Sequence, residues 1–361
     1  MSEHPAGHFE GHSSGVSPAT VPVASEPIGA SAGHGVNHLG YRGWSGRRSP
    51  GWLRWTVISA VGVRRAWPNK WLKRMLLLAW LPALWFGIGF FLWEQAALYP
   101  DWRDTLTPFL QGMPHTPEFA NIRQSLQTGN MADGRHTVWA WLLQTFFRYP
   151  QGVLMVMVVG VIAPPLISQD IRSRAFLLYF SRPLTRSEYL LGKLGSVWAY
   201  MLLISMVPAL SLYMLGVLLS PNLGVFADTW DLPFRIMAAS VVLILPTSVM
   251  ALCFSSLTQE SRYAGFAWFA VWILGWFTYG AATSAEAFNA QQAAFRGQPQ
   301  VEMAESAWTH LSLYHTLGRV QRWVFGFADF RDVLTSTVIV VAVTVLSLAI
   351  LYRRISAPMR I

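Results

Sequence analysis

Six apolar runs dominate the pattern of hydrophobic and polar positions along the chain. Each is about 20 residues long, the length at which a helix rising ~1.5 Å per residue crosses the hydrocarbon core of a bilayer. None of the six contains Asp, Glu, Lys, Arg or His. The pattern therefore predicts an all-α, polytopic membrane protein with six transmembrane helices, at residues 75–93, 151–168, 194–219, 236–257, 264–283 and 335–352.

A short basic connector, residues 169–193, joins the second apolar run to the third. It contains an apolar patch from Phe176 to Phe180 and then Pro183, whose ring disfavours helical geometry in the preceding residue. Thr185 and Glu188 have the spacing of a capping box, which starts a new helix. The order helix, break, helix is more elaborate than a simple link between spans needs. We interpret this connector as a docking surface, with a coupling helix between the second and third spans.

Two further segments have the pattern of amphipathic helices. Between residues 51 and 73, Trp52, Trp55 and Val63 share one side of a helical wheel, which predicts a helix lying in the membrane interface. The alternative is that this segment is simply the start of the first span. In the loop 284–334, apolar residues recur at helical spacing and predict a helix that packs against the bundle or lies on the outer leaflet: Leu313, Leu317, Val320, Val324 and Phe327. The loop 94–150 gives no clear signal.

Residues 1–50 are rich in Gly, Ser, Pro, Ala and His and have almost no large apolar side chains. Such a segment buries too little surface to offset the entropy of ordering, so we expect a disordered cytoplasmic tail. It lacks the basic start and short apolar core of a signal peptide. Its histidines have helical spacing, but Pro and Gly throughout the segment disfavour a helical metal site at His4, His8, His12, His34 and His38.

The basic residues predict the orientation of the chain. Of the 27 Lys and Arg residues, 18 lie before the first run, in the connector, in the loop after the fourth run or at the C-terminus. The positive-inside rule then places both termini and the connector in the cytoplasm. A net charge of +9 is explained by this topology and by anionic lipid headgroups, and no nucleic-acid motif accompanies it. The lone cysteine, Cys253, lies in a predicted span and excludes an intrachain disulfide.

The sequence contains none of the common catalytic or nucleotide-binding motifs. Gly192-Lys193 is followed by leucine and lacks the upstream glycine of a phosphate-binding loop. We therefore expect no cofactor in this chain and no ATPase of its own. None of the predicted spans carries the ionisable residue that ion-coupled transporters use. If the protein moves a cargo, its energy must come from a partner.

The connector resembles that of the ABC-2 type permeases, the transmembrane subunits of a class of ABC transporters. The matching residues are Ser181, Arg182, Pro183, Arg186, Gly192 and Lys193, after the acidic Asp170. The match departs where many relatives have Gly-Thr and this chain has Arg174-Ala175. The resemblance implies that residues 51–361 form one six-span permease domain in the cell membrane. It also implies an exporter, a separate ATP-binding subunit that binds the ATP, and a second, identical or different, permease subunit.

By this resemblance the coupling surface for the ATP-binding subunit consists of residues from both ends and the middle of the connector. They are Asp170, Arg174, Phe176, Tyr179, Phe180, Arg182, Pro183, Arg186, Glu188, Gly192 and Lys193. Five prolines in the first four spans are expected to kink them, namely Pro82, Pro164, Pro165, Pro208 and Pro246. A charge-free route suits an amphipathic or lipid-like cargo.

Two other classes of protein stay open. A membrane enzyme has His136, His310 and His315 in the outer loops as its only candidate catalytic residues. A membrane scaffold or assembly factor would use the connector to hold a partner without transport. The need for an ATPase partner separates the permease from both alternatives.

Overall fold

The structure is a computed structural model that describes residues 53–104, 117–128, 130–175, 184–221, 224–295 and 310–356. Every regular element within these residues is a helix. Six stretches are long and apolar enough to cross a membrane: Lys70–Leu98, Gly134–Arg172, Arg186–Leu219, Val225–Leu257, Ser261–Ala285 and Phe330–Ser356. The prediction of an all-α membrane protein with six spans is therefore confirmed. The tail, residues 1–50, lies outside the described residues.

Several spans are built from more than one helix. The first consists of α2 (Lys70–Leu78) and α3 (Leu81–Leu98), and the second of α6 (Met131–Phe146), a π-helical turn η3 (Phe147–Gln151) and α7 (Gly152–Arg172). The third consists of α9 (Arg186–Ile204) and α10 (Met206–Leu219). The fourth is α11 (Val225–Thr229) followed by α12 (Leu232–Leu257), and the last two are α13 (Ser261–Phe295) and α15 (Phe330–Ser356).

The five prolines expected to kink the spans divide into two groups. Pro82 lies in the first turn of α3, and Pro208 follows the interruption between α9 and α10 at Ser205. At these positions the proline begins a helix, where its missing N–H is tolerated. The other three, Pro164, Pro165 and Pro246, lie inside continuous helices.

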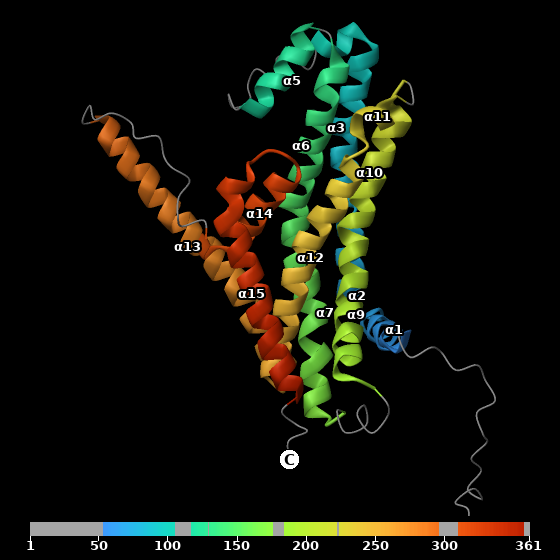
Figure 1. Ribbon diagram of the computed structural model, residues 1–361, viewed down its shortest axis with the longest axis vertical. Coiled ribbons are helices and arrows are strands. Elements are labelled where there is room, and N and C mark those ends of the chain that lie inside the picture. The colour runs from blue at the N-terminus through green and yellow to red at the C-terminus, as the bar shows by residue number, and fades with distance from the viewer. Residues whose placement is uncertain are drawn as a thin grey trace, which may run out of the picture. The chain divides into compact units, whose positions relative to one another are not determined.

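The fourth span is the centre of the bundle. Helix α12 packs against α7, α9, α10, α13, α14 (Leu313–Val324) and α15, and Figure 1 shows it between α15 and the pair formed by α7 and α9. In the most apolar 18-residue stretch of the fourth span 72% of the residues are buried, compared with 17% in the corresponding stretch of the fifth span. The spans at the periphery therefore present wide apolar faces to lipid or to a partner. Cys253 is buried in α12, as expected of a small core residue.

Both long loops, predicted at residues 94–150 and 284–334, contain helices that pack on the bundle. In the first, α5 (Pro117–Thr128) packs on α6, and α6 packs on α3. The sequence pattern missed both helices. In the second, the predicted amphipathic helix is confirmed as α14, with Leu317 and Val320 buried. It contacts α12, α13 and α15 (Figure 1), so it packs against the spans.

The segment before the first span forms a separate helix, α1 (Arg54–Ala66). A turn over residues 67–69 divides it from α2, which begins after Asn69, whose side chain accepts a hydrogen bond from the Trp71 N–H at 2.9 Å. Helix α1 packs against α9, and Figure 1 shows it nearly end-on beside the lengthwise α9. The segment is therefore not simply the start of the first span. Its position in the membrane interface stays a prediction.

Candidate functional site

The connector begins with a regular helix end that contains an unusual residue. After α7 the N–H of Arg174 donates to the carbonyl of Ile171 at 3.2 Å, and the N–H of Ala175 donates to that of Asp170 at 3.0 Å. This pair of hydrogen bonds is a Schellman motif, which requires a left-handed residue that is usually glycine. Arg174 holds this position, with φ at 53°. The motif thus places an exposed cation where a glycine would adopt the backbone conformation without steric cost.

The capping box predicted at the other end of the connector is confirmed. The Thr185 hydroxyl accepts a hydrogen bond from the Glu188 N–H at 3.2 Å, and the Glu188 carboxylate accepts from the Thr185 N–H at 2.7 Å. Together they satisfy two of the free amides at the start of α9. Glu188 therefore has a local structural role in addition to any contact with a partner.

A buried ion pair joins the two ends of the connector. The Lys193 ammonium lies 2.6 Å from the Asp170 carboxylate, and the Tyr189 hydroxyl donates to the same carboxylate at 2.7 Å. All three side chains are buried, with relative exposures of 6%, 3% and 0% for Lys193, Asp170 and Tyr189. Asp170 lies in the last turn of α7, and the other two lie in the first turns of α9. We call these three residues the clamp, because they fix the second span to the third where the connector leaves the bundle.

Gly192 allows α1 to approach α9 closely. A Cβ atom at Gly192 would lie 2.5 Å from the Cβ of Ile58 and 3.0 Å from the carbonyl oxygen of Trp55, so only glycine fits without movement. The Ser59 hydroxyl donates to the Gly192 carbonyl at 2.9 Å. One turn further, Ser196 donates to the Ser59 carbonyl at 3.3 Å. Small residues four apart are typical of close helix contacts in membranes, and here they seat α1 beside the clamp.

Two further contacts connect this region to the remaining spans. Arg172 lies 3.3 Å from Glu260, in the turn between α12 and α13, in an ion pair whose arginine is 66% exposed. Arg186 donates to the Ser356 hydroxyl, at the end of α15, at 3.0 Å. The connector is thus bonded to the ends of the second, third and sixth spans and to the turn between the fourth and fifth.

The structure describes six of the eleven predicted coupling residues. Asp170 and Lys193 come together in the clamp, Gly192 lies under α1, Glu188 caps α9, and Arg174 and Arg186 lie at opposite ends of the connector. The other five lie outside the described residues, so the coupling helix stays a prediction there: Phe176, Tyr179, Phe180, Arg182 and Pro183. Tyr189 was not singled out from the sequence, although its spacing of four residues from Lys193 places it on the same helix face.

Charged residues also occur deep in the helices at the other end of the bundle. Glu94 is fully buried in α3, and its carboxylate accepts two hydrogen bonds from Arg135 of α6, at 3.1 and 3.3 Å. Arg135 lies 3.7 Å from Asp228 of α11 as well. The six predicted ranges contain no ionisable residue, but the helices that carry them extend past these ranges and do. The signal available in the sequence was Glu94 itself, which directly follows a 19-residue apolar run.

A serine from the central helix hydrogen-bonds to the backbone of α7 beside its two prolines. The Ser255 hydroxyl accepts hydrogen bonds from the N–H groups of Ile167 and Ser168, both at 3.1 Å, and donates to the carbonyl of Pro164 at 2.6 Å. The hydroxyl of Ser255 thus bonds directly to the backbone of α7 in the turn that contains and follows the two prolines. The second and fourth spans are thereby joined one to two turns from the clamp.

Two of the three candidate histidines, His136 and His315, contact neighbouring side chains. His136 lies 2.9 Å from Asp231, which also pairs with Arg235. His315 stacks on Tyr279 with ring centroids 3.5 Å apart, and burial, together with the nearby Arg148, lowers its pKa from 6.5 to about 4. Among the described residues, no group of three or more His, Cys, Asp or Glu side chains is arranged to hold a metal ion.

The comparison with known families identifies the class of this protein. A family model described as "ABC-2 family transporter protein" matches residues 74–355, most of the chain and all six spans. No curated protein matches the chain significantly.

Proposed function

Because the chain belongs to the ABC-2 transporter family and is a permease subunit of an ABC transporter, we propose that it is an exporter driven by a separate ATP-binding subunit, which docks on the connector of residues 169–193. The observation that carries the proposal is the clamp, which joins the connector directly to the second and third spans. A connector anchored in this way can pass a displacement at its tip to the helices. A freely hinged link would absorb the same displacement.

The contacts around the clamp support a role in coupling. A force applied at the connector reaches the sixth span through Arg186 and Ser356, and the turn between the fourth and fifth through Arg172 and Glu260. Ser255 ties the second span to the central α12. The connector is therefore linked by hydrogen bonds or ion pairs to most of the bundle, and ATP-driven movement of the partner would shift these helices together.

We propose that both termini and the connector are cytoplasmic and that the protein lies in the cell membrane with a second permease subunit. The distribution of Lys and Arg supports the orientation. In the most apolar stretches of the fifth and sixth spans only 17% and 22% of the residues are buried, so both spans have wide apolar faces that leave room for a second subunit. A permease needs a separate ATP-binding subunit as its energy source, whereas a scaffold does not. The sequence and structure give no specific support for a scaffold.

Cysteine labelling tests the orientation on which docking depends. Cys253 is buried, so a new exposed cysteine supplies the main signal. We expect Thr128→Cys, on the outer helix α5, to react with an impermeant maleimide in intact cells, and Ser173→Cys to react only after the membrane is opened. Both positions are exposed. Equal labelling of Ser173→Cys in intact cells would place the connector outside, where no ATP-binding subunit could dock.

A further inference from the structure

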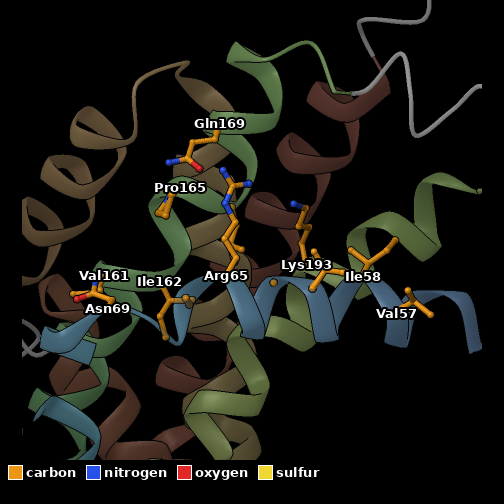
Figure 2. Close-up of a pocket in the computed structure, with 13 residues that line it drawn as sticks. Val57, Ile58, Arg65, Asn69, Val161, Ile162, Pro165, Gln169 and Lys193 are labelled. Carbon is orange, nitrogen blue, oxygen red and sulfur yellow. The ribbon is translucent and has the colours of Figure 1, made fainter. Parts of the chain in front are cut away.

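A cavity lies between α1 and α7, beside the clamp. Its volume is about 340 Å³, and it is lined by residues of α1, of α7 and by Lys193 of α9. Figure 2 shows α1 crossing below the cavity, with the Arg65 side chain rising from it toward Gln169 and Lys193. The cavity borders the connector, whose two end residues, Gln169 and Lys193, are among its lining residues. Its volume is within the range of cavities that hold small ligands, about 300 Å³ and above.

The two main walls carry the same order of side chains. On α1 the residues Val57, Val61 and Arg65 are spaced by four and so share one helix face. On α7 the residues Val161, Pro165 and Gln169 have the same spacing. Each wall therefore changes from two apolar residues to one polar residue. On α7 the polar residue lies nearest the connector, where the helix leaves the apolar part of the span.

The charge of the cavity is positive. Lys193 is neutralised by Asp170 at 2.6 Å, but no ion pair within the described part of the chain involves Arg65. The lining residues include no carboxylate. Gln169 and Asn69 add amide groups that donate hydrogen bonds without adding charge. The cavity thus presents one guanidinium without an ion-pair partner in the described residues, with the Gln169 amide on the same side (Figure 2), and guanidinium groups match phosphate oxygens well.

The apolar part of the wall is open to the surroundings. Val57 and Val61 are each 58% exposed, although they are large apolar side chains on a helix that packs against the spans. A soluble anion would leave these valines uncovered, whereas a lipid acyl chain would cover them. The combination of an exposed apolar strip with a cation one turn further is the pattern of a molecule with an acyl chain and an anionic headgroup.

We propose that this cavity binds an anionic glycerophospholipid of the leaflet at the connector end, with its phosphate on Arg65, one acyl chain along Val57 and Val61 of α1, and the other along Val161 and Pro165 of α7. The bound lipid would fill the space between α1 and α7 and so brace α1 against the spans beside the clamp. This assignment does not depend on the identity of the cargo or on the docking of an ATP-binding subunit.

Native mass spectrometry of the purified protein, titrated with phosphatidylglycerol or with the zwitterionic phosphatidylcholine, tests the proposal. A charged hydrogen-bonded contact is worth about 1.5–3 kcal/mol, so Arg65→Gln should weaken retention of the tightest phosphatidylglycerol by about tenfold or more. Arg64→Gln is the matched control, because Arg64 is the adjacent exposed arginine of α1 and does not line the cavity. We expect it to change the affinity less than twofold.

A second pair of variants tests the location without changing charge. Val61→Trp should fill the cavity and displace the lipid, whereas Ala60→Trp, at an exposed neighbouring position that does not line the cavity, should not. Equal losses of lipid affinity in Arg65→Gln and Arg64→Gln would show a non-specific basic surface and overturn the proposal. Equal losses in Val61→Trp and Ala60→Trp would show that the lipid does not occupy the cavity and would also overturn it. Displacement of the lipid by millimolar glycerol phosphate would overturn it in favour of a soluble anion.

Discussion

Removing either charge of the clamp should destabilise the protein strongly, and removing both should not. In Asp170→Asn the Lys193 ammonium, 6% exposed, loses the carboxylate 2.6 Å away. In Lys193→Met the carboxylate of Asp170, 3% exposed, loses its ammonium and keeps only the Tyr189 hydroxyl at 2.7 Å. Breaking a buried pair from one side costs about 3–5 kcal/mol, because a charge stays buried without a partner.

The double variant Asp170→Asn/Lys193→Met leaves no buried charge at the clamp. Neutral replacement of a whole buried pair is often close to neutral in stability. We therefore expect the double variant to recover most of the loss, with a coupling free energy of about 2 kcal/mol or more between the two sites. Tyr189→Phe, which removes one hydrogen bond to a charged group, should cost about 1.5–3 kcal/mol.

The free energy of unfolding in mixed detergent micelles, followed by circular dichroism, measures these differences. Arg172→Gln is the control, because its ion pair with Glu260 also joins two segments at the connector end of the bundle but is exposed. An exposed pair is worth about 0–1 kcal/mol. If the losses in the two single clamp variants simply add in the double variant, or if neither exceeds the loss in Arg172→Gln, the clamp is not a stabilising ion pair and the reasoning is refuted.

Two further predictions follow from local geometry. Arg174→Gly should raise the free energy of unfolding by about 1 kcal/mol, because glycine adopts the left-handed φ of 53° without the steric cost that arginine bears; Arg174→Ala should give no such gain, and an equal gain in both would refute the reasoning. The pKa of His315 is lowered from 6.5 to about 4, so the folded protein favours the neutral imidazole. The stability that this neutral side chain contributes is present above pH 6.5 and is lost as the pH falls toward 4. Unfolding measured across that range should show a shallower decline for His315→Phe, and an unchanged slope would contradict the assignment.

The spans could be predicted from the sequence because the bilayer is a demanding solvent. A run of about 20 apolar residues without charge matches the thickness of the hydrocarbon core and seldom occurs in soluble proteins. The limits of the helices could not be predicted in the same way. Glu94 and Asp170 each lie just beyond an apolar run, where a charge normally marks the edge of the hydrocarbon. In the folded protein each is neutralised by a residue far away in the sequence, so the helix continues past it.

The candidate site was predicted at its local level only. The capping box at Thr185 and Glu188 depends on residues three apart, so its spacing in the sequence was sufficient. The clamp depends on residues about 20 apart on two helices, and the close contact at Gly192 depends on α1, more than 100 residues earlier in the sequence. Pairings of this kind arise from tertiary packing and leave no local pattern.

The most direct test of the central claim is whether the connector holds and activates an ATP-binding subunit. Four changes in the connector are combined: Phe176→Ala, Tyr179→Ala, Arg182→Glu and Arg186→Glu. Loss of a buried aromatic anchor at an interface costs on the order of 2 kcal/mol or more, and reversed charges repel an acidic surface. The control combines Phe226→Ala, Trp230→Ala and Arg331→Glu, exposed residues near the ends of α11, α12 and α15 that lie away from the connector.

Co-purification of the ATP-binding subunit and permease-stimulated ATP hydrolysis are measured for both variants and the unaltered protein. We predict that the connector variant loses both, that its loss of binding is salt-dependent when only the arginines are changed, and that the control variant retains both. A connector variant that is inserted in the membrane and still binds and stimulates its ATPase normally would contradict the claim that the connector is the coupling surface.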